Sequence, residues 1–271
     1  MRNTLKGSGE RQKVCEDGVN MDFLQGYVSY VSDLPRVIAE KETPAILKAA
    51  QKLAETTQKG GLIHIIGTGA HSSLGCGEFF VRPGSLMNIN PIYDPAFCLS
   101  HGASRCWLLE HIPNYVNPVL DYYYFEPGEP IIIVNPYGIN CATIDAAMWA
   151  REKGLFIIAV TSPSFSKRVP AESTSRHPSR QNLCDLADVV LDLHLPTGDA
   201  MVRIDGFEHT CAPVSTVSLS VILSMLNAQA VRLLVESGHT PDVIASPYTY
   251  QDAATHNREM VAKYIEKIKH L

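Results

Sequence analysis

Short, almost entirely apolar runs alternate along this chain with longer segments whose apolar residues recur at helical spacing. Strands buried on both faces of a parallel sheet read as continuous hydrophobic runs, so the apolar runs predict such a sheet. They cover residues 62–66, 131–134, 155–161 and 189–194, with a weaker run at 86–92. The helical pattern is found at 71–82, 104–111, 115–124, 140–153, 181–187, 214–237 and 256–270.

The N-terminal part of the chain predicts a leader and two helices. Residues 1–20 are polar and charged, which is typical of a flexible leader and excludes a secretory signal. Residues 21–40 carry an apolar stripe that Pro35 bends or divides, and Thr43-Pro44 begins a second helix that ends near Gln58. We therefore expect one three-layer α/β domain over 21–271, with helices on both faces of the sheet and an N-terminal helical extension.

Composition narrows the functional class. The formal net charge is −5, whereas a general nucleic-acid binder normally has a basic face. No apolar run reaches 18 residues, so no membrane span is expected. The seven cysteines are scattered and form no CxxC motif, which favours reduced thiols and a cytoplasmic location over a disulfide framework.

The segment Gly67-Thr68-Gly69-Ala70-His71-Ser72-Ser73 is the strongest candidate binding turn. It follows a buried strand and precedes a helix, so its hydroxyls and backbone N–H groups suit an anion or a polyhydroxylated ligand. It is neither a GxGxxG motif nor a P-loop. Ligands of parallel sheets bind at the carboxyl ends of the strands, so the loops at 135–140, 161–166 and from 196 onward are the other places to search.

A series of further motifs, in order along the chain, resembles one known family. They are Gly67–Ser72, Glu78–Leu86, Asn90–Ala96, His101–Ser104, Arg151–Leu155, Ile158–Ser162, Ser175–His177, Ala187–Asp192, Gly198–Ala200, Pro213–Thr216 and Glu266–Leu271. Over about residues 21–271 the chain resembles a sugar isomerase (SIS) domain, and in particular single-domain bacterial proteins related to phosphoheptose isomerase. The resemblance implies a flavodoxin-like sheet of five parallel strands, a homodimer or homotetramer, and a phosphosugar ligand.

The second loop departs from that family. The resemblance leads us to expect Ser-x-Ser-Gly there, with hydroxyls that hold a phosphate, but the chain has Asn135-Pro136-Tyr137-Gly138-Ile139-Asn140. Gly138 and Asn140 are kept, and both serines are replaced. Backbone N–H groups with Ser72, Ser73, Thr161 and Ser162 remain able to hold a phosphate. A carboxylate, a sulfonate or a neutral polyol stays open as the alternative.

Aldose–ketose isomerisation requires a base, a group that polarises the carbonyl, and contacts to the rest of the sugar. The resemblance suggests Glu78 as the base, the alternative being a solvated helix charge. It also suggests His256, delivered from a neighbouring subunit, and His177 is a plausible acid–base group in a long loop. The predicted substrate-binding residues are Gly67, Thr68, Gly69, His71, Ser72, Ser73, Asn135, Gly138, Asn140, Thr161, Ser162, Arg176, Ser215 and Thr216.

The leading hypothesis is therefore an isomerase that acts on a sugar phosphate or an acidic sugar. A lyase or etherase of amino-sugar phosphates and a non-catalytic sugar-phosphate sensor are the alternatives. We expect no nucleic-acid or membrane partner, no cofactor and no metal, although the resemblance leaves a zinc site of distant Glu and His residues open.

Overall fold

Five parallel strands form the centre of the molecule, in the order β2-β1-β3-β4-β5. The computed structural model describes residues 23–196 and 198–271, so the expected leader at 1–20 lies outside the described residues. The strands are β1 Ile63–Gly67, β2 Ile89–Ile92, β3 Pro130–Val134, β4 Phe156–Thr161 and β5 Val189–Asp192. The five-stranded flavodoxin-like sheet expected from the sequence is thus confirmed.

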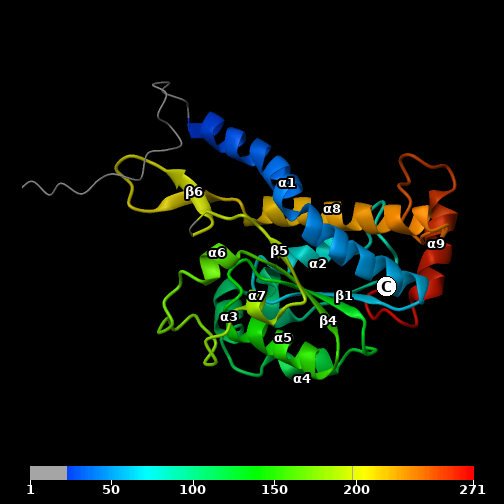
Figure 1. Ribbon diagram of the computed structural model, residues 1–271, viewed down its shortest axis with the longest axis horizontal. Helices are drawn as coiled ribbons and strands as arrows, with labels where there is room; N and C mark the ends of the chain where they lie inside the picture. The colour runs from blue at the N-terminus through cyan, green and yellow to red at the C-terminus, as the bar shows by residue number, and fades with distance from the viewer. Residues whose placement is uncertain (1–22, 197) are drawn as a thin grey trace, which may run out of the picture.

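Helices cover both faces of this sheet. They are α1 Phe23–Gln58, α2 Leu74–Phe79, α3 Ala103–Leu109, α4 Val116–Asp121, α5 Cys141–Glu152, α6 Pro163–Ser166, α7 Leu183–Leu186, α8 Ser215–Glu236 and α9 Ala253–Tyr264. Two short 3-10 helices, Pro95–Phe97 and Leu99–His101, precede α3. Figure 1 shows α1 and α8 above the sheet and α4 and α5 below it.

Side chains that alternate along each strand explain the two layers. Ile63 and Ile65 of β1 pack into the core shared with α1, α2 and α8, whereas Ile66 packs into the core shared with α4, α5 and α7. Both cores are apolar and fully buried, which is why the strands read as continuous hydrophobic runs. Burial of the strands on both faces therefore explains both the sequence pattern and the three-layer packing.

The first helix differs from the sequence expectation. The break expected at Pro44 does not occur, and α1 runs through both Pro35 and Pro44 to Gln58 (Figure 1). A proline inside a helix removes one backbone hydrogen bond and costs about 3 kcal/mol. Buried residues on both sides of Pro44, including Ile38 and Leu53, belong to the same core, so their burial outweighs that cost.

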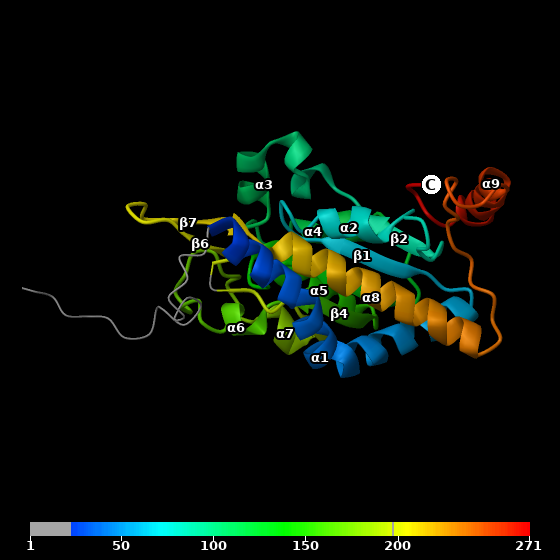
Figure 2. The ribbon, with the colours of Figure 1, turned by 90° about the horizontal axis from the view of Figure 1, so that it is seen from above.

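An antiparallel hairpin also lies outside the sequence expectation. Strands β6 Ala200–Arg203 and β7 Thr210–Pro213 pair next to the start of α8. Their residues are mostly exposed or half-buried, so they carry no continuous apolar run. Figure 2 shows the hairpin extending beyond one end of the sheet, with α9 near the other end.

Helix α8 is long and apolar enough to cross a membrane by length and composition, the only such helix within the described residues. It packs against α1, and Leu219, Ile222 and Leu226 are buried in the core. These contacts are those of a core helix.

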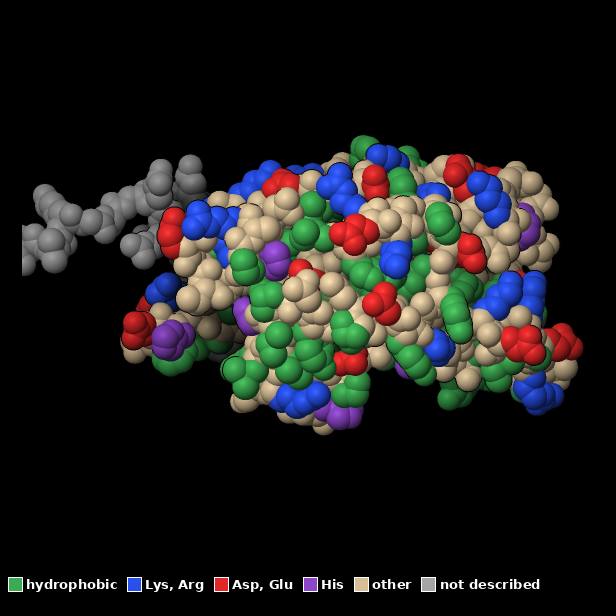
Figure 3. Space-filling view, turned by 90° about the horizontal axis from the view of Figure 1, so that it is seen from below, with side chains coloured by type: hydrophobic (Ala, Val, Ile, Leu, Met, Phe, Trp, Pro, Cys, Tyr) green, Lys and Arg blue, Asp and Glu red, His purple; other side chains and the backbone are tan. Residues whose placement is uncertain are grey.

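On the face drawn in Figure 3, Lys and Arg side chains are interspersed with Asp and Glu, and hydrophobic side chains lie between them.

A buried polar cluster ties β1 to the start of β3. Asn90 Nδ2 donates to His64 Nδ1 (3.0 Å), so the ring proton is on Nε2, which donates to Glu129 Oε2 (2.8 Å). Burial alone would raise the pKa of the Glu129 carboxyl. Hydrogen bonds from His64 and from the N–H groups of Glu126 and Leu62 outweigh burial and lower that pKa. Glu129 is therefore a fully satisfied buried carboxylate.

We expect Glu129→Ala to lower the free energy of unfolding by about 3–5 kcal/mol, because it leaves a buried partner and two N–H groups unpaired. Urea unfolding followed by circular dichroism measures the change. Glu126→Ala, which removes an exposed carboxylate three residues away, is the control and should change stability by less than about 0.5 kcal/mol. Equal losses in the two variants would contradict this role for Glu129.

Candidate functional site

The carboxyl ends of β1 and β3 lie side by side, with Gly67 opposite Val134 in the parallel ladder. The loops that follow these strands line a cavity of about 420 Å³, together with the end of α3 and the start of α8. It is the position at which ligands of such sheets are expected. The lining residues are Gly69, Ala70, His71, Ser72, Trp107, Glu110, Asn135, Pro136, Tyr137, Asn140, Asp199, Pro213, Ser215 and Thr216.

The first loop makes a tight turn that depends on glycine. A Cβ on Gly67 would lie 2.2 Å from the Ser72 carbonyl oxygen, so no other residue fits without moving the backbone. The turn is closed by hydrogen bonds from Ser73 N–H to the Gly69 carbonyl (3.2 Å) and from Leu74 N–H to the His71 carbonyl (3.1 Å). This geometry places His71 and Ser72 at the cavity and begins α2 immediately behind them.

One carbonyl joins the first loop to the second. The oxygen of Thr68 accepts from Asn135 Nδ2 (3.0 Å) and from Asn140 Nδ2 (3.0 Å). Thr68 itself is fully buried, and its Oγ1 lies 2.6 Å from Thr143 Oγ1 in α5. The two loops therefore hold a single relative position, with both asparagines facing the cavity.

The oxygens of the same two asparagines organise the second loop. Asn135 Oδ1 accepts from the N–H groups of Tyr137 (3.1 Å) and Gly138 (2.8 Å). Asn140 Oδ1 accepts from Thr143 N–H (2.9 Å) and so caps the N-terminus of α5. Each amide thus makes its contacts within the protein, and the loop is built without the serines that the resemblance leads one to expect.

Glu110 is the site residue that the sequence pattern missed. It follows the last residue of α3, and a Cβ added to Gly69 would lie 2.9 Å from its Oε2. Burial raises the pKa of this carboxyl, and His111, Ala70 N–H and the Asn140 side chain only partly offset the rise. Glu110 stands in no recognisable motif, and only the packing of α3 beside the turn brings it to Gly69.

A second carboxylate lies at the start of α8. Asp199 Oδ1 accepts from the N–H groups of Val214 (3.0 Å) and Ser215 (2.7 Å), and Oδ2 accepts from Ser215 Oγ (2.8 Å). Asp199 is held at φ +67°, a left-handed conformation that is uncommon for a residue other than glycine. Burial raises the pKa of the Tyr137 hydroxyl, and the charge of Asp199 raises it further. The cavity is thus lined by two acidic groups.

Seven of the predicted substrate-binding residues line this cavity: Gly69, His71, Ser72, Asn135, Asn140, Ser215 and Thr216. Six others lie in or next to the two loops but outside the lining: Gly67, Thr68, Ser73, Gly138, Thr161 and Ser162. Thr161 and Ser162 are fully buried, and a Cβ on Gly138 would lie 2.6 Å from Thr161 Oγ1. These hydroxyls lie beneath the second loop.

The remaining candidates lie elsewhere. Arg176 donates to Asn182 Oδ1 (2.9 Å) and to the carbonyls of Ser166 and Val169. Its side chain therefore stabilises the loop to which it belongs.

His177 is buried and bonded to Asp145 Oδ1 (3.1 Å) and Ser179 Oγ (2.7 Å). Glu78 pairs with Arg82 (3.5 Å). His256 Nε2 donates to the Val243 carbonyl (2.8 Å), at a separate cavity. The catalytic roles of Glu78, His177 and His256 remain predictions.

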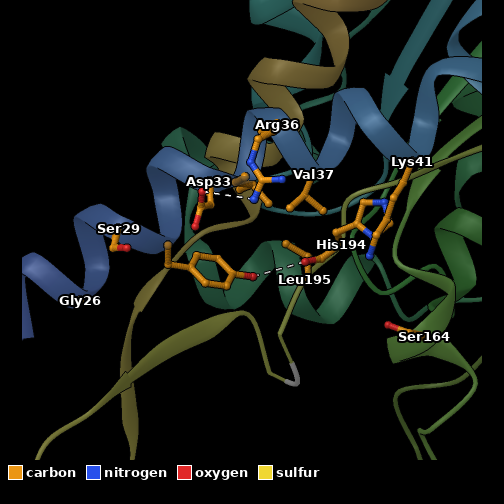
Figure 4. A pocket seen from close by; sticks show the side chains of 11 residues that line it. Gly26, Ser29, Asp33, Arg36, Val37, Lys41, Ser164, His194 and Leu195 are labelled. Atoms are coloured by element: carbon orange, nitrogen blue, oxygen red, sulfur yellow. Dashed lines mark hydrogen bonds and ion pairs between the residues drawn. The ribbon is translucent and has the colours of Figure 1, made fainter. Parts of the chain in front are cut away.

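Another cavity, of about 470 Å³, lies between α1 and the segment that follows β5 (Figure 4). Tyr30 Oη donates to the His194 carbonyl (3.4 Å), and Arg36 pairs with Asp33 (3.5 Å) across its rim. His194 Nε2 is bonded to Glu42 (2.8 Å). None of the predicted site residues lines it, so the cavity at β1 and β3 is the candidate site.

Metal binding has no geometric support in the part of the chain that is described. No three His, Cys, Asp or Glu side chains gather there closely enough to hold an ion. The cavity carboxylates bond to N–H, amide and hydroxyl groups of the protein instead.

Comparison with known proteins places the chain in a family. The SIS domain family model matches residues 26–162. A UPF0309 protein of Listeria monocytogenes serotype 4b is 34% identical over 246 residues, which cover 91% of this chain and 97% of the relative. A UPF0309 protein of Geobacillus kaustophilus is 33% identical, covering 91% and 96% of the two chains.

Among solved structures, a phosphoheptose isomerase from Francisella tularensis is 13% identical with a TM-score of 0.47, covering 79% of this chain and 99% of that chain. The family match and the two sequence relatives agree over most of the described fold. This protein therefore belongs to the SIS domain family and, within it, to the UPF0309 proteins.

Proposed function

We propose that the cavity at the ends of β1 and β3 binds a sugar and that Glu110 transfers the proton in an aldose–ketose isomerisation. The observation that supports this most is the position of Glu110, a carboxylate lining the cavity beside the turn after β1. Membership of the SIS domain family supports a carbohydrate ligand. The cavity volume of about 420 Å³ lies in the range of small-molecule sites.

Isomerisation through an enediol needs one base that removes a proton from the carbon next to the carbonyl and returns it to the neighbouring carbon. A carboxylate whose pKa is raised toward neutral pH suits both steps, because it holds the proton more readily than an exposed Glu does. Burial raises the pKa of Glu110 in this direction. The contacts from Ala70 N–H and Asn140 keep the carboxyl oriented at the turn.

The carbonyl oxygen of the substrate needs a second group that donates a proton or a hydrogen bond. His71 is exposed and lines the same cavity, so it can serve as that group. Ser72, Ser215 and Thr216 supply hydroxyls at the walls for the remaining sugar oxygens. Proton transfer and sugar binding then use residues of one chain.

We expect Glu110→Gln to lower kcat by about 10²–10⁴-fold, because the amide cannot accept the proton. The measurement is aldose–ketose conversion of the sugar that best stabilises the protein, followed by chromatography of both isomers. Glu78→Gln makes the same change in the carboxylate predicted from sequence, and should leave kcat within about twofold, because Glu78 lies outside the cavity.

The two variants separate the hypotheses. Loss of turnover in Glu78→Gln with full turnover in Glu110→Gln would overturn the role of Glu110. It would support Glu78, the base that the sequence resemblance suggests. Release of a second fragment in the product analysis would identify an elimination. Binding without turnover in the unmodified protein would identify a sensor.

The raised pKa of Glu110 also predicts a stability effect. A carboxyl whose pKa is higher in the folded state than in the unfolded state favours folding at low pH, and this contribution is lost as pH rises through the folded-state pKa. At pH 7 the ionised group is therefore a cost that Glu110→Gln removes. We expect a rise in Tm of about 2 °C at pH 7.

The rise should shrink as the pH falls below the ordinary carboxyl pKa, where Glu110 is protonated in both states. Scanning calorimetry of both proteins between pH 4 and pH 8 measures it. A Tm difference that stays constant with pH would show that Glu110 is not destabilised by burial.

A further inference from the structure

The long helix α8 is apolar on two opposite faces. On its inner face Leu219, Ile222, Leu226 and Ala230 are buried in the core that α8 shares with α1. Nevertheless, only 39% of the most apolar 18-residue stretch of the helix is buried. A helix that is hydrophobic all round normally lies in the interior of a larger structure. The inner contacts therefore account for only part of the apolar surface of α8.

The outer face carries a regular stripe of small and β-branched residues. Residues spaced alternately by four and three positions stay on one side of a helix, which is the spacing of a helix–helix contact. In α8 such a series stands two residues, or about 200°, away from the buried residues. We call it the outer seam, and it consists of Val217, Val221, Ser224, Ala228, Val231 and Val235. Ser224, Ala228 and Val235 are exposed, and the other three are half-buried.

The surface around the outer seam is accessible and partly apolar. Figure 2 shows α8 on the upper side of the molecule, between α1 and α2. A groove of about 440 Å³ lies between α2 and α8, and Ser224, Ala228 and Val231 are among its lining residues. Exposed apolar side chains also lie on the flanking helices, with Leu47 on α1 and Leu74 on α2. An element that packs on the outer seam would therefore meet an apolar surface wider than the seam itself.

The order of residue sizes along the outer seam is the same in both directions. A twofold axis between Ser224 and Ala228 makes the seam complementary to its own copy, as an isologous interface requires. The pairs that antiparallel helices form across this axis are Val217 with Val235, Val221 with Val231, and Ser224 with Ala228. Each valine then meets a valine, and the small residues meet at the centre, where two crossing helices approach most closely.

The residues beside the seam are compatible with this pairing. Arg232 and Glu236 pair with each other on the same helix (2.7 Å), so neither brings an unpaired charge to the contact. The other possible occupants fit less well. Residues 1–20 are polar and charged, which does not suit an apolar stripe. A helix that lies on a membrane normally combines large apolar side chains with several Lys or Arg residues, and the outer seam has neither.

We propose that the outer seam of α8 joins two copies of this chain in an antiparallel dimer with twofold symmetry. The inference is independent of the proposed function, because it holds for an isomerase and for a sensor alike. It also places the two sites relative to each other. Ser215, which lines the candidate cavity, precedes the seam by two residues, so the two cavities of the dimer lie at opposite ends of the paired helices.

Cysteine substitution tests the antiparallel pairing in the full chain. In the double variant Val217→Cys/Val235→Cys each new thiol faces its counterpart across the axis. Mild oxidation should therefore link most chains in pairs, which a non-reducing gel detects. Each single variant should stay unlinked, because position 217 of one copy lies about 27 Å along the helix from position 217 of the other, too far for a disulfide.

The unsubstituted protein, with its seven native cysteines, gives the background of linkage under the same oxidation. Linkage of the single variants would show parallel pairing and overturn the antiparallel arrangement. A double variant that links no more than the background would overturn the interface.

Ala228→Arg tests the interface by placing a charge next to the axis. We expect the dimer dissociation constant to rise at least about 100-fold, because each copy then buries an unpaired guanidinium. Ala254→Arg makes the same change at an exposed position of α9 and should leave the constant within about twofold. Sedimentation equilibrium between about 0.1 and 100 µM protein measures the constants.

Circular dichroism melting shows that both variants are folded, because Ala228 is exposed in the single chain. An unsubstituted protein that sediments as one chain at every concentration would overturn the proposal, and so would an unchanged dissociation constant in folded Ala228→Arg. Flotation with phosphatidylcholine–phosphatidylglycerol vesicles tests the membrane alternative, and we expect no protein to float. Flotation that Ala228→Arg abolishes would assign the outer seam to lipid and overturn the dimer.

Discussion

The site depends on the buried carbonyl of Thr68, which accepts an amide from each end of the second loop. Asn135 and Asn140 donate to this one oxygen at 3.0 Å each. A hydrogen bond of this kind contributes about 1 kcal/mol net, whereas a buried carbonyl or amide left unpaired costs about 1–3 kcal/mol. The relative position of the two loops is therefore fixed mainly because any other position would leave these buried polar groups unpaired. Parallel pairing of β1 and β3 brings the two loops to the same edge of the sheet, and the double contact sets their relative position.

The same two amides also organise the second loop. Their nitrogens hold Thr68, and their oxygens accept the N–H groups of Tyr137, Gly138 and Thr143. These contacts satisfy three backbone donors within the protein and fix the conformation of the loop. Rigidity at the carboxyl edge and the placement of both asparagines at the cavity are thus two consequences of one hydrogen-bond network. Asn135 stands where the resemblance leads one to expect a serine, and it organises the loop by accepting the N–H groups of Tyr137 and Gly138.

The fold was predictable from the sequence because each strand is buried on both faces and each layer has its own apolar pattern. The turn at Gly67 was predictable as well, since an apolar run that stops at glycine and continues into a helix has few other structures. Glu110 was not, because it follows a short helix 41 residues beyond Gly69 and only tertiary packing joins them. The continuous α1 was missed because local proline chemistry predicts a break, and burial of residues on both sides of Pro44 overrides it.

Asp199 shows how the chain resolves a conflict between folding and binding at this edge. The start of α8 needs an acceptor for its N–H groups, and a ligand anion or a side chain can provide it. A side chain provides it here, at the cost of a left-handed backbone at Asp199. The helix is then capped whether or not a ligand is bound, so folding does not depend on the ligand. The Asp199 carboxylate therefore stays at the cavity wall in the absence of a ligand. In the proposed function, the walls of the cavity are therefore set by folding alone, and Glu110 and His71 lie at it before any sugar binds.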